Sequence, residues 1–134
     1  MKRLSLWGAI ISLVLLVSCK KNTESVDVCI YGGTSAGVIA AYTASMEGKT
    51  VLLVEPGRHL GGMTSGGLGY TDIGNKFVVT GLTRDFYRRI GSHYGKFEQW
   101  IFEPSVAENI FKDYVERGNV KVLYSHRLNE VKKD

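Results

Sequence analysis

Residues 26–37 read Val-Asp-Val-Cys-Ile-Tyr-Gly-Gly-Thr-Ser-Ala-Gly, and residues 49–55 read Lys-Thr-Val-Leu-Leu-Val-Glu. The apolar runs in these two segments contain several β-branched side chains and are typical of strands covered on both faces. Between them, residues 35–47 carry small side chains at spacings of three and four, which favours a helix lying close to a sheet. Gly48 is placed to end this helix. A strand, a helix and a strand in so short a stretch predict a right-handed parallel unit of an α/β fold.

The glycines after the first strand predict a dinucleotide site of the Rossmann type. Gly32 permits a tight turn, Gly37 lets the helix approach the strand, and the helix N-terminus offers unpaired N–H groups to a pyrophosphate. Thr34 departs from the G-x-G-x-x-G pattern, because it stands where a glycine usually lets the backbone approach phosphate. Glu55 closes the next strand, where an acid accepts a ribose hydroxyl. The residues expected to hold the dinucleotide are Gly32, Gly33, Thr34, Ser35, Ala36, Gly37 and Glu55.

One alternative bears on this site: Gly32 and Gly33 form only a turn, and Glu55 merely ends a strand. A P-loop is excluded, because no Lys-Ser or Lys-Thr follows Gly37.

A second glycine cluster favours FAD over NAD as the cofactor. Leu60-Gly-Gly-Met-Thr-Ser-Gly-Gly67 follows the acidic strand directly, and seven glycines lie between Gly57 and Gly74. An NAD domain has no evident need for such a loop, whereas FAD proteins often place one across the pyrophosphate and the flavin. A loop this long is usually functional or disordered, so a flexible loop without a ligand is the competing hypothesis. The residues expected on the flavin side are Gly61, Gly62, Met63, Ser65, Gly66 and Gly67.

These motifs together resemble a known family. Residues 31–37, Glu55-Pro56, 59–63 and 66–69 are similar to the N-terminus of a bacterial family of FAD-dependent oxidoreductases, related to the flavoprotein subunit of heterodisulfide reductase. The resemblance runs from about residue 26 to the end of the chain. It implies FAD as the cofactor and flavin-mediated electron or hydride transfer on a small molecule. Threonine at the third position of the glycine turn is familiar in this family.

The resemblance does not extend to iron–sulfur clusters. Some relatives of the heterodisulfide reductase type hold such clusters with cysteines, but this chain contains two cysteines in all. Cys29 lies in the first apolar strand and is expected to be a small buried hydrophobe. The three histidines are far apart in sequence, so no metal site is expected.

The rest of the chain predicts two more helices and up to two more strands. One helix is expected from about residue 81 to 94 and another from Pro104, with Ser105 and Glu108 as a capping box. Residues 120–124 are a candidate third strand and residues 128–131 a candidate fourth.

The N-terminus predicts export and a lipid anchor. Residues 1–18 combine Lys2-Arg3, a short apolar run and a small-residue boundary, which indicates a signal peptide. Leu16-Val-Ser-Cys19 resembles the lipobox of bacterial lipoproteins, so Cys19 is the expected lipidation site, followed by a polar tether over 19–25. Cleavage there lowers the formal net charge from +4 to +2, which favours neither nucleic acid nor an anionic partner. The expected location is a membrane, on its periplasmic or cell-surface side.

The length of the chain limits what it is expected to do alone. The relatives are several times longer and carry a substrate domain, whereas residues 26–134 match only the N-terminal part of an FAD-binding domain. A truncated or partial chain, lacking its C-terminal substrate domain, is therefore expected. A non-catalytic nucleotide-binding remnant tethered to the membrane and an NAD-dependent oxidoreductase fragment stay open as alternatives. No residue is assigned to proton transfer.

Overall fold

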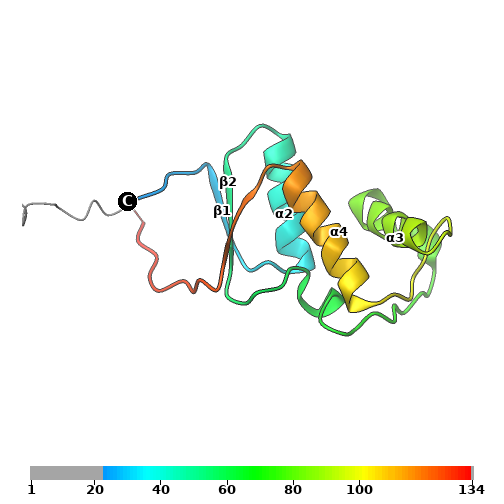
Figure 1. The fold of residues 1–134 in the computed structure, drawn as a ribbon. Coiled ribbons are helices and arrows are strands. Elements are labelled where there is room, and N and C mark those ends of the chain that lie inside the picture. Colours follow the sequence, from blue (N-terminus) through cyan, green and yellow to red (C-terminus); the bar gives the residue numbers. More distant parts are fainter. Residues whose placement is uncertain (1–22, 134) are drawn as a thin grey trace, which may run out of the picture.

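The computed structural model describes residues 23–133, which form a small parallel sheet covered by helices (Figure 1). The predicted signal segment 1–18 and the lipidation site Cys19 lie outside the described residues. The elements in chain order are β1 (Val28–Tyr31), α2 (Ser35–Met46), β2 (Val51–Glu55), the 3₁₀ turns η1 (Gly62–Thr64) and η2 (Lys76–Val78), α3 (Gly81–His93), α4 (Pro104–Arg117) and β3 (Lys121–Tyr124). The expected α/β class, the first two strands and all three helices are confirmed.

The three strands are parallel and lie in the order β1-β2-β3. Tyr31 pairs with Val54, and Glu55 pairs with Tyr124, so the carboxyl ends of all three strands reach the same edge of the sheet. The N–H of Gly32 donates to the carbonyl of Val54 at 2.7 Å, which extends the pairing into the turn. This register places the glycine turn after β1 beside the acid at the end of β2.

The helices and the sheet share one apolar core. Helix α2 packs on β1 and β2, α4 packs beside α2, and α3 packs against α4 (Figure 1). The rings of Phe86 from α3 and Phe111 from α4 stack with centroids 4.9 Å apart. The largest side chains that are completely buried are Val38, Leu53, Leu60, Ile90 and Tyr114. Leu60 belongs to the loop after β2, so the core holds this loop as well as the regular elements.

The prediction that β1 is covered on both faces is wrong for the described residues. Its burial alternates, with Val28 and Ile30 packed against the core and Cys29 and Tyr31 exposed. Successive side chains of a strand point to opposite faces, and the described helices lie on one face only. Cys29 is therefore not the buried core residue that its apolar neighbours predicted.

Two further predictions for the second half are corrected. Helix α4 begins at Pro104 with Glu103 at the N-cap, and no side chain caps it. Ser105 lies inside the first turn, and Glu108 pairs with the Lys112 ammonium at 2.9 Å, so the expected capping box is absent. Proline at the first helical position explains the shift, because its fixed φ suits that position. Residues 128–131 form no strand, whereas residues 121–124 form β3 as expected.

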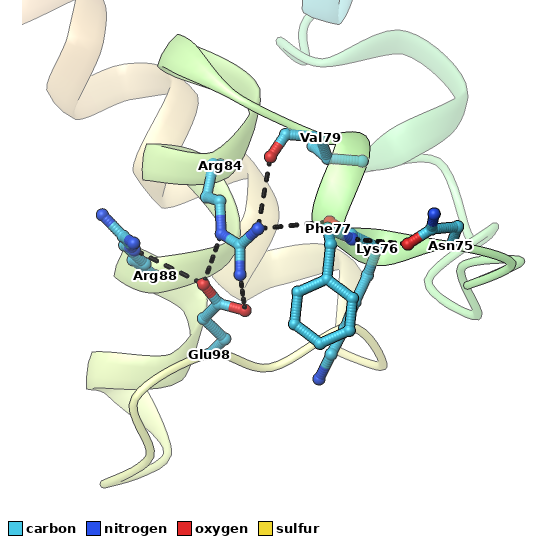
Figure 2. A network of polar contacts seen from close by, with 7 residues as sticks. All are labelled: Asn75, Lys76, Phe77, Val79, Arg84, Arg88 and Glu98. Atoms are coloured by element: carbon cyan, nitrogen blue, oxygen red, sulfur yellow. Dashed lines mark hydrogen bonds and ion pairs between the residues drawn. The ribbon is translucent and has the colours of Figure 1, made fainter.

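A network around Arg84 of α3 fixes both ends of the α3 region (Figure 2). The Arg84 guanidinium donates to both Glu98 carboxylate oxygens, at 2.7 and 3.1 Å, and to the carbonyls of Lys76 and Val79 at 3.2 and 3.3 Å. The Glu98 side chain is 7% exposed, and its hydrogen bond from Arg84 holds its pKa below the usual range. The network ties the end of the long loop after β2 to α3 and to the segment before α4.

Within residues 23–133, no helix is both long and apolar enough to cross a membrane. The same residues bring together no group of three His, Cys, Asp or Glu side chains suited to a metal ion.

Candidate cofactor site

The turn between β1 and α2 is built by direct contact between backbones. Gly32 has φ of 105°, which an L side chain rarely adopts. A Cβ on Gly37 would lie 2.0 Å from the carbonyl oxygen of Gly32, so no larger residue fits there. Both roles that the sequence predicted are confirmed: Gly32 makes the tight turn, and Gly37 lets α2 approach β1.

Thr34 is the N-cap of α2. Its Oγ1 accepts a hydrogen bond from the N–H of Gly37 at 3.1 Å. Such a cap satisfies one of the four N–H groups that a helix start leaves without intrahelical partners. The N–H groups of Ser35 and Ala36 belong to the same first turn, where the helix dipole favours an anion. The departure from glycine at Thr34 therefore has a structural reason that the pattern alone does not give.

Glu55 lies beside the glycine turn and holds it. One carboxylate oxygen accepts the N–H of Gly33 at 2.6 Å, and the other accepts the N–H of Gly57 at 2.5 Å. Each carboxylate oxygen has two lone pairs, so the group retains acceptor capacity for a ribose hydroxyl. Glu55 thus holds the backbone of Gly33 and Gly57 in place, a role that the sequence did not predict. Its predicted role is to bind the ribose.

The second glycine cluster meets the first at Gly33. The N–H of Gly61 donates to the carbonyl of Gly33 at 2.7 Å, and Gly61 also forms a parallel bridge with Thr34. Completely buried Leu60 anchors this contact, and the Ser65 hydroxyl donates to the Leu60 carbonyl. The two glycine segments, which are separated in the chain by α2, β2 and a loop, thereby form one continuous surface at the carboxyl edge of the sheet.

The predicted site residues fall into two groups in the structure. The turn, Glu55, Gly61 and Gly62 lie in contact with one another. Met63, Gly66 and Gly67 lie on the outside of the loop, where the Met63 side chain is 76% exposed. Contacts within the protein explain the residue types of the inner group. They explain less of the outer group.

One pair near the site was missed from the sequence. The Nδ1 of His59 lies 3.1 Å from a carboxylate oxygen of Glu108 on α4. Both residues line a cavity of about 390 Å³ beside the glycine loop. Burial raises the pKa of Glu108, but hydrogen bonds from Lys112 and His59 outweigh it and lower the pKa overall. The two residues are 49 positions apart, so no local pattern could have paired them.

Comparison with known proteins places these features in a family. Residues 27–134 match the family described as FAD dependent oxidoreductase. The chain is 31% identical over 88 residues to thiamine thiazole synthase of Pyrococcus horikoshii, which covers 65% of this chain and 33% of that protein. It is 36% identical over 83 residues to beta-cyclopiazonate dehydrogenase of Aspergillus oryzae, which covers 57% of this chain and 18% of that protein.

A solved structure is also similar. The crystal structure of Thermovibrio ammonificans THI4 aligns with a TM-score of 0.48 and 18% identity, over 92% of this chain and 47% of that chain. The chain thus spans a third or less of the curated relatives named above. Because the family match covers nearly all the described residues, including both glycine segments and Glu55, the chain belongs to the FAD dependent oxidoreductase family.

Proposed function

We propose that this chain is the FAD-binding part of an oxidoreductase that transfers electrons or hydride between the flavin and a small molecule. The observation that carries the proposal is the convergence on Gly33. Its N–H donates to Glu55, and its carbonyl accepts from Gly61, so the turn, the acid and the second glycine cluster are held as one unit. Family membership supports FAD as the cofactor of this unit.

The residues present fit the cofactor. A Cβ on Gly37 would overlap the Gly32 carbonyl, so the turn packs directly against the start of α2. The N–H groups of Ser35 and Ala36 lie in this first helical turn, where a pyrophosphate can bind. In the proposal, Gly32, Gly33, Thr34, Ser35, Ala36 and Gly37 hold the pyrophosphate, Glu55 the adenosine ribose, and residues 61–67 the flavin side. When bound, FAD supplies the redox chemistry, and the protein supplies orientation and exclusion of competing reactions.

The proposal extends to the whole protein and its location. An enzyme of this kind must also bind its substrate next to the flavin. We assign substrate binding to a C-terminal substrate domain. The signal segment 1–18 and lipidation of Cys19 would hold the proposed enzyme on a membrane, exposed to the periplasm or the cell surface. A lipid anchor of more than one acyl chain gives stable attachment, whereas a single chain is marginal.

The experiment uses the full 134-residue chain, expressed with added FAD and purified in detergent. The expected result is a flavin absorption spectrum that stays with the protein through gel filtration and bleaches on anaerobic reduction. NAD under the same conditions is expected to separate from the protein. Retention of NAD without FAD would instead support the NAD-dependent alternative.

A Glu55→Ala variant tests the site within the same experiment. It removes the carboxylate that accepts the N–H groups of Gly33 and Gly57 and that is proposed to bind the ribose. Loss of flavin from this variant, with the helix content unchanged by circular dichroism, supports site-specific binding. Equal flavin retention by both proteins contradicts the proposed site. Bound FAD that cannot be reduced supports the alternative of a non-catalytic nucleotide-binding remnant.

A further inference from the structure

Helix α4 lies against the beginning of the second glycine cluster. Figure 1 shows the loop after β2 next to the first turns of this helix. The contact involves three successive loop residues, His59, Leu60 and Gly61, which come directly before η1. No residue of α4 is among those that the sequence predicts for the cofactor, so the sequence gives this helix no part in the site.

Gly61 is held between α4 and the first glycine turn. On one side its N–H donates to the carbonyl of Gly33 at 2.7 Å. On the other side it packs on the ring of Phe111, since a Cβ on Gly61 would lie 2.5 Å from a ring carbon. Leu60, the residue before it, is completely buried. The loop therefore enters the proposed cofactor site in a position set by α4 as well as by the turn.

His59 adds a polar contact between the loop and α4. Its Nδ1 lies 3.2 and 3.1 Å from the two carboxylate oxygens of Glu108. An ionised carboxylate only accepts hydrogen bonds, so in this pairing Nδ1 carries the proton and donates. The Lys112 ammonium lies 2.9 Å from the same carboxylate, on the α4 side. Glu108 thus connects the loop to the helix two residues before Gly61.

The two partners differ in exposure. The Glu108 side chain is 14% exposed, whereas that of His59 is 78% exposed. Ion pairs with an exposed partner contribute little to global stability. Such a pair can still order a loop, because local opening needs much less free energy than global unfolding. We therefore expect the pair to affect the loop and not the stability of the whole fold.

The pair lies at the flavin side of the proposed site. Both residues line the cavity beside the glycine loop, and Gly62 and Ser65 of the second glycine cluster line it with them. Because Gly62 follows His59 by three residues, a displacement of His59 also displaces the residues that are proposed to contact the flavin.

We infer that Glu108 is a positioning residue for the cofactor, which acts through His59 to fix the second glycine cluster where it contacts the flavin half of FAD. The inference rests on the proposed function. It gives α4 a part in the preference for FAD over ADP, because only the flavin half of FAD reaches residues 61–67 in the proposed complex.

The test compares FAD with ADP, which contains only the half proposed to lie on the glycine turn and Glu55. Dissociation constants are measured for the full chain by isothermal titration calorimetry. Glu108→Ala and His59→Ala should each raise the Kd for FAD about threefold and leave the Kd for ADP unchanged. Glu116→Ala is the matched control, because Glu116 is exposed near the other end of α4. A general loss of folding would weaken the binding of both ligands.

The double variant distinguishes a connected pair from two independent residues. His59→Ala combined with Glu108→Ala should weaken FAD binding about threefold, as each single substitution does, and not about ninefold. Lys112→Ala leaves the contact between His59 and Glu108 in place and should change the Kd for FAD less than either. Additive effects, unchanged FAD binding, or equal weakening of FAD and ADP would each overturn the inference.

Amide hydrogen exchange of the chain without cofactor separates the inference from the proposed function. Glu108→Ala should speed exchange in residues 59–67 and leave residues 32–37 unchanged. A wild-type chain that binds no FAD would overturn the proposed function and, with it, the role of Glu108 in binding. A wild-type chain that binds FAD, together with unchanged loop exchange in Glu108→Ala, would overturn the inference alone.

Discussion

The two glycine segments of this chain use glycine for different reasons. In the turn after β1, a Cβ on Gly37 would meet the backbone of Gly32 at 2.0 Å, so the fold itself requires glycine there. On the outside of the second cluster, a Cβ on Gly67 would meet nothing within 4 Å, although the φ of 120° at this residue is one that side chains rarely adopt. Packing against the Gly32 carbonyl therefore requires glycine at Gly37, whereas at Gly67 only the backbone conformation favours it.

The two segments also differ in how stability and binding are linked. Substitutions in the turn should damage the fold and the cofactor site together, because one set of contacts serves both. Substitutions of exposed side chains on the outer loop, such as that of Met63, should affect binding alone. Four single substitutions test this division, and they follow in order of decreasing expected effect on stability.

Gly37→Ala is expected to have the largest effect. Its Cβ would overlap the Gly32 carbonyl, and neither backbone can move without separating α2 from β1. Overpacking of this kind typically costs about 1–3 kcal/mol, and we expect about 3 kcal/mol in the free energy of unfolding by urea. Thr43→Ala on the exposed side of α2 is the control and should change it by less than about 0.5 kcal/mol. A Gly37→Ala protein as stable as this control would show that the close approach is not required.

Glu55→Gln should lower stability less than Gly37→Ala, but it should weaken both the hold on the turn and the proposed binding of the ribose. The amide offers one acceptor oxygen where the carboxylate accepts from both Gly33 and Gly57, so one N–H loses its partner. Hydrogen bonds to charged groups contribute about 1.5–3 kcal/mol, and we expect a loss of about 2 kcal/mol. The Kd for FAD, measured by flavin fluorescence, should rise about tenfold. Unchanged stability with weakened FAD binding would restrict Glu55 to the ribose role.

Glu98→Gln tests the side-chain network that holds the far end of the long loop (Figure 2). The pKa of Glu98 is lowered in the folded protein, chiefly by its hydrogen bond from Arg84. Its contribution to stability is therefore full above the unfolded pKa of about 4.3 and is lost as the pH falls through the folded value. The urea midpoint of the variant should lie below that of the wild type at about pH 7, and the two should converge in acid. A gap that persists below both pKa values would assign the effect to packing.

Met63→Ser should leave stability unchanged within about 0.5 kcal/mol, because the side chain is largely exposed. In the proposed complex this side chain covers the flavin, so we expect the Kd for FAD to rise about threefold from lost apolar contact. Met46→Ser is the matched control, since Met46 is also exposed but lies at the far end of α2. Equal FAD affinities of the two variants would remove Met63 from the site.

Much of the fold could be predicted because it is encoded locally. The β-branched runs predicted the two strands, and Gly48 predicted the end of the helix between them. The parallel pairing of β1 and β2 follows from that strand–helix–strand order. The exposure of Cys29 could not be predicted, because an apolar strand does not reveal whether one face or both will be covered. The capping box failed because Pro104 and Ser105–Glu108 offer two starts for one helix, and proline determined the observed one.

The sequence predicts which residues form the candidate site, but it does not predict the contacts between them. Glycine spacing indicated that Gly33 and Gly61 both serve the cofactor, but their hydrogen bond depends on Leu60 being buried between distant elements. The pairing of His59 with Glu108 likewise arises only when α4 lies against the loop. Contacts across such sequence distances follow from tertiary packing, which no local pattern contains.

The most direct test of the central claim is amide hydrogen exchange of the full chain with and without FAD. If the two glycine segments form one cofactor site, FAD should slow exchange in residues 32–37 and 61–67 together, at the same half-saturating concentration. NAD at equal concentration should leave the 61–67 segment unchanged. Protection confined to one of the two segments, or equal protection by NAD, would contradict the account.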